Sequence, residues 1–298
     1  MRMNIKSFIK KLLGSWSQDK VATLSAGLSY YTIFSIGPLL VISIAIAGLF
    51  LDKNVVQDNL LEQIGNTFGK DPADQIKIMI SNVKPSTHII SNIISTIILL
   101  FGASGFFGAL QTGLNQIWGV APKANSGLMG LIKSRFLSFT LVLGVGFLLL
   151  ISLILSLVLS FISNYLLQFL PQLAILSYAL NLFISLLGVT LLFALILKYI
   201  PDIELQWRDV WLGAFFTALL FTLGKLILGI YLSYSNLSKG YGAAGALILI
   251  LVWIYYSAQI LFTGAEFTKV LLLQKGKHIK PSDNAELISD ELKKHKKK

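Results

Sequence analysis

Six apolar segments dominate this chain of 298 residues and limit it to folds that a lipid bilayer accommodates. Hydropathy places them at residues 24–50, 89–110, 136–163, 174–197, 210–234 and 242–271. A helix needs roughly 20 apolar residues to cross a bilayer, and each segment meets that length. Only 13% of the residues are charged, against about 25% in ordinary soluble domains. We therefore expect an all-α fold, a polytopic bundle of six transmembrane helices within residues 21–275.

Residues 1–20 predict a basic amphipathic helix ahead of the first span. Lys6, Lys10 and Lys11 alternate with apolar residues at helical spacing, namely Ile5, Phe8, Ile9, Leu12, Leu13 and Trp16. Such a helix can lie in the interface of an anionic leaflet. Packing on the cytoplasmic face of the protein itself is the alternative, and the two are compatible. This segment lacks the continuous apolar core of a signal peptide.

The distribution of lysine and arginine predicts the orientation. Basic residues concentrate in the N-terminal segment, in the second and fourth connections, and in a polar tail at 276–298 that we expect to be mobile. Both termini are therefore predicted to be cytoplasmic, and anionic lipids of the inner leaflet are the expected partners. This placement explains the net charge of +11 without nucleic-acid binding.

The first connection, at about 51–87, is the one long extracytoplasmic segment expected. It predicts two short helices, and in the second of them Ile76, Met79, Ile80 and Val83 form one apolar face. That face can pack on the bundle or dip into the outer interface. A helical lid over a central cavity is the functional alternative.

Polar side chains gather in the cytoplasmic halves of three spans. In the last span Tyr255, Gln259, Thr263 and Glu266 follow at steps of four, four and three, so they share a helix face. The first two spans add Tyr30, Tyr31, Gln111 and Asn115 at a similar depth. The pattern predicts a cytoplasm-facing polar cavity around Glu266. Interhelical hydrogen bonding is the alternative, at about 0.6 kcal/mol per bond.

Lys225 is the other intramembrane charge. At 1.5 Å per residue it lies about 22 Å from the inner end of its span, and Glu266 about 10 Å from the inner end of its own. We therefore expect no direct bridge between them. The glycines of the second span, Gly102, Gly105 and Gly108, predict close helix packing.

Four sequence blocks carry a resemblance to a known family. They are GLSYYTIFSIGPLL, SRFLSFTLVLGVGFLLL, YIPD followed by WRDVWLGA, and YGAAGALILILVWIYYSAQILFTGAEFTKV. In this order they resemble the bacterial YihY/BrkB membrane proteins, which have been linked to virulence. The positions that match the family motifs are Tyr30, Tyr31, Pro38, Pro201, Tyr241, Gly242, Gly245, Trp253, Tyr255, Gly264 and Glu266. The resemblance implies a six-helix protein of the cytoplasmic (inner) membrane.

Members of that family once carried the label ribonuclease BN, and the residues argue against it. Metal-dependent nucleases need clustered His and Asp ligands, whereas this chain has only His88, predicted to be extracytoplasmic, and His278 and His295, both in the tail. We expect no enzyme activity, no metal and no cofactor.

The leading functional hypothesis is a transporter-like or lipid-handling protein. An unidentified small molecule or lipid would enter the polar cavity, with Glu266 as a proton or cation site, because a carboxylate is costly to bury in a membrane. The alternative is an envelope interaction or scaffold protein that transports nothing.

Overall fold

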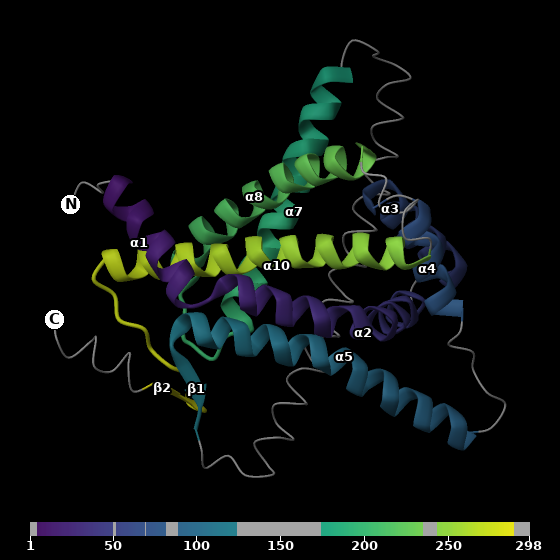
Figure 1. The fold of residues 1–298 in the computed structure, drawn as a ribbon, viewed down its shortest axis with the longest axis horizontal. Helices are drawn as coiled ribbons and strands as arrows, with labels where there is room; N and C mark the ends of the chain where they lie inside the picture. The colour runs from purple at the N-terminus through teal and green to yellow at the C-terminus, as the bar shows by residue number, and fades with distance from the viewer. Residues whose placement is uncertain are drawn as a thin grey trace.

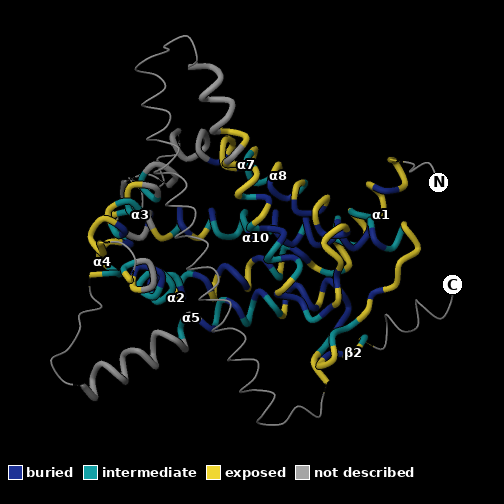
Figure 2. Tube along the Cα trace, turned by 180° about the vertical axis from the view of Figure 1, so that it is seen from behind, coloured by how far each residue is buried: buried dark blue, intermediate teal, exposed yellow. Residues whose placement is uncertain are grey.

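The computed structural model describes residues 5–49, 52–68, 70–81, 89–123, 174–234 and 243–288. Its elements are, in chain order, α1 (Ile5–Gln18), α2 (Val21–Ala47), α3 (Lys53–Phe68), α4 (Lys70–Ser81), α5 (Ile89–Trp118), β1 (Val120–Pro122), α7 (Ala174–Tyr199), α8 (Trp207–Tyr234), α10 (Ala243–Gln274) and β2 (Ala285–Leu287). The long helix α10 runs through the middle, between the α2/α5 pair and the α7/α8 pair (Figure 1). Buried residues concentrate where these helices meet (Figure 2).

Three of the described helices are long and apolar enough to cross a membrane. These stretches are Val21–Ala45, Trp207–Leu228 and Leu247–Gln274, and α7 adds a shorter apolar stretch at Ser185–Tyr199. The chain is therefore mostly helical with membrane-length segments, as the hydropathy predicts. The third predicted span, at 136–163, lies outside the described residues, so the count of six remains a prediction.

The polar residues along the buried side of α2 are satisfied within the helix. The hydroxyls of Ser25, Ser29 and Thr32 each donate to the carbonyl four residues earlier, at 2.6–2.8 Å. All three side chains are buried. Since an unpaired hydroxyl is costly in an apolar environment, this bonding lets the helix bury polar residues without a partner helix.

Helices α8 and α10 cross through two reciprocal glycine–threonine pairs. A Cβ placed on Gly213 would lie 1.8 Å from the Thr268 hydroxyl oxygen, and one on Gly264 would lie 1.8 Å from that of Thr217. Each threonine hydroxyl donates to the carbonyl of the glycine on its own helix, at 2.6 and 2.7 Å. The crossing therefore depends on the absence of side chains at both glycines.

Of the three glycines predicted to pack on α5, two do so. A Cβ on Gly102 would meet Pro38 Cγ at 2.9 Å, and one on Gly105 would meet the Ser35 hydroxyl at 3.5 Å. At Gly108 nothing lies within 4 Å. The α2–α5 contact thus uses the first two positions of the predicted stripe.

The first connection forms the two helices α3 and α4, which lie against the end of α2 and near the start of α10 (Figure 1). Ile44 of α2 and Val56 of α3 form a small buried cluster, with Leu60 and Ile80 packed against it. Ile76 is buried as well. The apolar face of α4 therefore packs on the protein, and Val83 lies outside the described residues.

The expectation that the tail is mobile is wrong for residues 276–288. There β2 pairs antiparallel with β1, and an isolated bridge joins Ile203 to Pro281. Ile279 and Ala285 are 5% and 4% exposed. Ile279 belongs to the main apolar core, and Ala285 pairs with Pro122 of β1. Burying these two residues offsets the entropy lost by ordering the segment. Residues 289–298 lie outside the described part of the chain.

Candidate functional site

The acid predicted to be central, Glu266, lies deep inside the helix bundle on α10. Its side chain is 0% exposed, and it is one of the largest fully buried side chains described. Thr263, one turn earlier, is half-buried. Both face α1, so the polar stripe of α10 points toward another helix of the protein.

Helix α1 covers the last two residues of this stripe, Thr263 and Glu266. Ser15 Oγ donates to Glu266 Oε2 at 2.6 Å, and Trp16 Nε1 donates to Thr263 Oγ1 at 3.1 Å. Nearer its start, α1 places the Phe8 ring edge-on against Phe267, with 5.2 Å between centroids. The N-terminal helix therefore lies directly over the acid, in contact with Thr263, Glu266 and Phe267 of α10.

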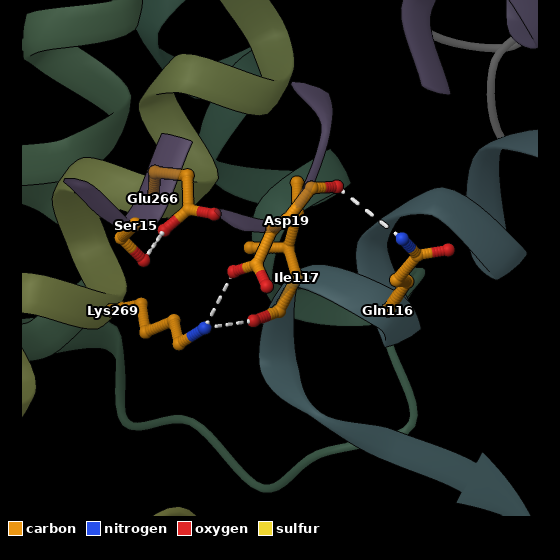
Figure 3. Close-up of polar contacts among 6 residues, drawn as sticks. All are labelled: Ser15, Asp19, Gln116, Ile117, Glu266 and Lys269. Atoms are coloured by element: carbon orange, nitrogen blue, oxygen red, sulfur yellow. Dashed lines mark hydrogen bonds and ion pairs between the residues drawn. The ribbon is translucent and has the colours of Figure 1, made fainter. Parts of the chain in front are cut away.

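One ammonium group lies within the same cluster. Lys269 Nζ donates to Asp19 Oδ2 at 2.8 Å and to the Ile117 carbonyl at the end of α5 at 2.5 Å. The Gln116 amide donates to the backbone carbonyl of Asp19 at 3.3 Å. Figure 3 shows the turn between α1 and α2 tied in this way to both α5 and α10.

The charges and bonds of the cluster do not balance. Glu266 Oε1 is buried and has no hydrogen-bond donor. It points toward the carboxyl group of Asp19 (Figure 3). The cluster therefore holds two carboxyl groups and one ammonium group, and the ammonium group forms its ion pair with Asp19. Two facing carboxyl groups repel when both are ionised, and they form a hydrogen bond when one proton is present.

Two of the predicted cavity residues belong to a different cluster. Gln111 Nε2 donates to both carboxylate oxygens of Asp202, at 3.1 and 3.2 Å, and Asn115 Nδ2 donates to Oδ2 at 2.7 Å. The backbone N–H of Asp202 donates back to Asn115 Oδ1 at 2.8 Å. These bonds attach the α7–α8 connection to α5, a role that the sequence analysis did not assign to Asp202.

The two tyrosines predicted on α2 do not face Glu266. Tyr30 and Tyr31 are 61% and 50% exposed. Their rings contact each other, and Tyr30 also contacts Phe34. The buried polar side of α2 is the one that carries Ser25, Ser29 and Thr32, described above. Tyr30 and Tyr31 are thus in contact with neither of the two clusters.

The remaining predicted residues are Tyr255 and Gln259 on α10 and Lys225 on α8. Tyr255 and Gln259 are half-buried on α10, and the Gln259 carbonyl accepts from the Thr263 hydroxyl at 2.6 Å. Lys225 is exposed on α8 next to Gly224, whose Cα lies against Tyr256. Glu266 lies two to three turns along α10 from Tyr256, beside the crossing of α8 and α10.

Three members of the Glu266 cluster were missed from the sequence: Ser15, Asp19 and Lys269. Ser15 and Asp19 are one helical turn apart, and Lys269 follows Glu266 by three residues. An acid and a lysine at this spacing near the end of an apolar span was the available signal. Among the described residues, no group of three or more His, Cys, Asp or Glu side chains could hold a metal ion.

The fold and the site define a helical integral membrane protein with a buried acid–base cluster beneath its N-terminal helix. The chain belongs to the virulence factor BrkB family, whose family model matches residues 12–287. No solved structure matches it.

Curated relatives match almost the whole chain. A UPF0761 membrane protein of Actinobacillus pleuropneumoniae is 28% identical over 91% of this chain and 95% of its own length. The proteins of the same name from Glaesserella parasuis and Tolumonas auensis are 28% and 26% identical, over 90% and 85% of this chain and 92% and 81% of their own lengths. Each of them is named only as a membrane protein.

Proposed function

We propose that this protein is a transporter-like or lipid-handling protein of the bacterial cytoplasmic membrane, in which Glu266 takes up and releases a proton. The observation that carries the proposal is the burial of Glu266 in an apolar, membrane-length helix with one oxygen lacking a donor. Ionisable groups in such positions are costly and typically belong to ion or substrate pathways. A glutamine or serine would link α10 to α1 at lower cost.

The proposed orientation has both termini in the cytoplasm. The arrangement of the described segments supports it, because the segments predicted to be cytoplasmic lie together. At one end of the bundle the α1–α2 turn contacts the end of α5, β1 pairs with β2, and Ile203 bridges Pro281 (Figure 1). Helices α3 and α4 lie at the other end. The basic residues of α1 and of the tail would then meet the anionic inner leaflet.

The substrate pathway is proposed to reach Glu266 from the cytoplasmic side, through the region that α1 covers. With α1 in place the acid is sealed, so the structure corresponds to a closed state in this proposal. Access requires separation of α1 from α10. The contacts to be broken are two side-chain hydrogen bonds to α10, one aromatic contact and the Asp19–Lys269 ion pair.

A reconstitution experiment tests the proposed role. The protein is incorporated into vesicles of phosphatidylethanolamine and phosphatidylglycerol with a trace of head-group-labelled fluorescent phospholipid. Dithionite bleaches only the outer leaflet, so extra bleaching reports lipid movement. We expect lipid movement between the leaflets at a rate that depends on pH. Glu266→Gln should lose this pH dependence. The matched control Glu286→Gln, which replaces an exposed acid on β2, should keep it. Equal rates and pH profiles in the two variants would refute a role for Glu266.

The second candidate function is an envelope interaction protein without transport. It is favoured by the exposed apolar residues of α1, because Ile5, Ile9 and Leu13 are 66%, 48% and 62% exposed on a helix that is already packed on α10. In this case the Glu266 cluster only anchors α1. Vesicles would show no lipid movement for any variant. Replacing these three residues by serine would abolish the function of the protein in the cell.

A further inference from the structure

We infer that Asp19 and Glu266 form a proton-binding pair that holds α1 closed over the membrane domain, so that loss of this one proton releases α1. The inference concerns the regulation of the site proposed above and rests on that proposal for the meaning of the opening. The opening itself can be measured whether or not transport is detected.

The geometry of the two acids requires a proton for stable contact. Glu266 Oε2 already accepts from Ser15, and Oε1 points toward Asp19 with no donor of its own (Figure 3). Asp19 Oδ2 is occupied by Lys269. A proton between Asp19 and Oε1 would convert two facing acceptors into one hydrogen bond. It would also complete the charge count, because two carboxylates and one ammonium leave one negative charge in excess.

Among the described residues, Asp19 and Lys269 are the charged groups that face Glu266. Asp19 comes from the α1–α2 turn, and Lys269 comes from α10 itself. Helix α1 contributes the Ser15 hydroxyl, and α5 contributes the Ile117 carbonyl to Lys269. Helix α8 presents the Thr217 side chain to Gly264, two residues before Glu266. The charge state of the cluster is therefore set by the two acids and one lysine.

The position of Asp19 makes the proton relevant to α1. Asp19 directly follows the last residue of α1, and Lys20 continues into α2 through a left-handed turn with φ of 52°. The backbone here is held by Gln116 of α5. Repulsion between Asp19 and Glu266 would therefore act at the hinge between α1 and α2. The rest of α1 contacts α10 through few side chains, chiefly Phe8 and Trp16.

The direction of the pH effect follows from linkage. The closed state binds one more proton than the open state, in which the two acids are separated. Closure is therefore favoured at low pH, and raising the pH opens α1. With one proton involved, the closed-to-open ratio changes by at most about tenfold per pH unit.

Cysteine labelling measures the opening directly, since the chain has no cysteine. The full chain carrying Phe8→Cys is purified into phosphatidylethanolamine/phosphatidylglycerol nanodiscs and treated with a maleimide at a series of pH values. Phe8 is 6% exposed, so its substitute reacts only when α1 opens. Leu13→Cys, at a position 62% exposed, corrects for the pH dependence of the thiol reaction. Leu12→Cys, at a half-buried position, serves as a second reporter because it leaves the Phe8–Phe267 contact intact.

We expect the labelling rate of both reporters, relative to Leu13→Cys, to rise with pH by up to about tenfold per unit. Adding Glu266→Gln should make the ratio low and independent of pH, since the amide donates permanently to Asp19. Glu286→Gln should change nothing. A ratio independent of pH with Glu266 present would overturn the inference. So would an unchanged pH dependence in Glu266→Gln, or a dependence on sodium concentration instead of pH.

If labelling follows pH as expected while vesicles show no lipid movement, the proton-held closure stands and the transport proposal fails. If lipid movement depends on Glu266 while labelling is independent of pH, the transport proposal stands and the proton-held closure fails.

Discussion

Substituting Gly264 by alanine should destabilise the α8–α10 crossing by an amount that the geometry sets. The new Cβ would lie 1.8 Å from Thr217 Oγ1, 2.9 Å from its Cβ and 3.0 Å from its Cγ2. Rotation of the threonine moves the hydroxyl but not Cβ, so the helices must separate by a few tenths of an ångström or more. Overpacking of this kind costs about 1–3 kcal/mol. The gain in helix propensity from glycine to alanine offsets at most about 1 kcal/mol of this.

The reciprocal contact, between Gly213 and Thr268, gives an internal check on this estimate. Gly213→Ala brings its Cβ 1.8 Å from Thr268 Oγ1 and 3.0 Å from its Cβ, so we expect a similar loss of about 1–3 kcal/mol. Both pairs lie in one crossing, and a separation forced by one alanine makes room for the other. The double variant should therefore lose less than the sum of the two single losses.

The assay is equilibrium unfolding by sodium dodecyl sulfate in mixed micelles, followed by circular dichroism. Gly108→Ala is the matched control, because nothing described lies within 4 Å of a Cβ there. We expect it to be neutral or slightly stabilising. Thr217→Ala should partly rescue Gly264→Ala, since it removes Oγ1 and Cγ2. Equal stability of Gly264→Ala and Gly108→Ala would refute the close-packed crossing.

Three further predictions concern the end of the bundle that carries β1 and β2. Asp202→Ala removes the acceptor of two amides and should cost about 1.5–3 kcal/mol in the same assay, with a smaller loss in Asp202→Asn. Lys277→Met leaves Asp209, 8% exposed, without its ion partner and should cost about 1–2 kcal/mol after allowing for the 42% exposure of the lysine. The hydrogen bond from Lys280 to the Glu204 carboxylate raises the pKa of Lys280, so the small contribution of this exposed pair should be present at neutral pH and lost as the pH rises through that raised value. Alkaline titration of stability in the wild type and Lys280→Gln checks the last point.

Much of the helical architecture follows from hydropathy, because only helices satisfy the backbone in lipid. The ends of the described helices agree with the predicted spans to within a few residues in α2, α7, α8 and α10. The order of the tail could not be predicted in this way. It depends on pairing between β1 and β2, three residues each and separated by more than 160 positions, a contact without a local pattern.

The polar stripe of α10 was predictable because it depends only on spacing along one helix. Its partners were not, since Ser15 and Glu266 are 251 residues apart. Grouping Tyr30 and Tyr31 with this stripe rests on their depth along the helix and neglects the helix face on which they lie. Helical spacing links Ser25, Ser29 and Thr32 on the buried side of α2 and leaves the tyrosines on the other side.

The most direct test of the account is the difference infrared spectrum of the protein between low and high pH. It reports the carboxylic-acid C=O stretch, which only a protonated carboxyl group shows. We predict such a band that disappears as the pH rises and is absent in Glu266→Gln but retained in Glu286→Gln. A pH difference spectrum that is identical with and without Glu266 would contradict the proposal that this residue binds and releases a proton.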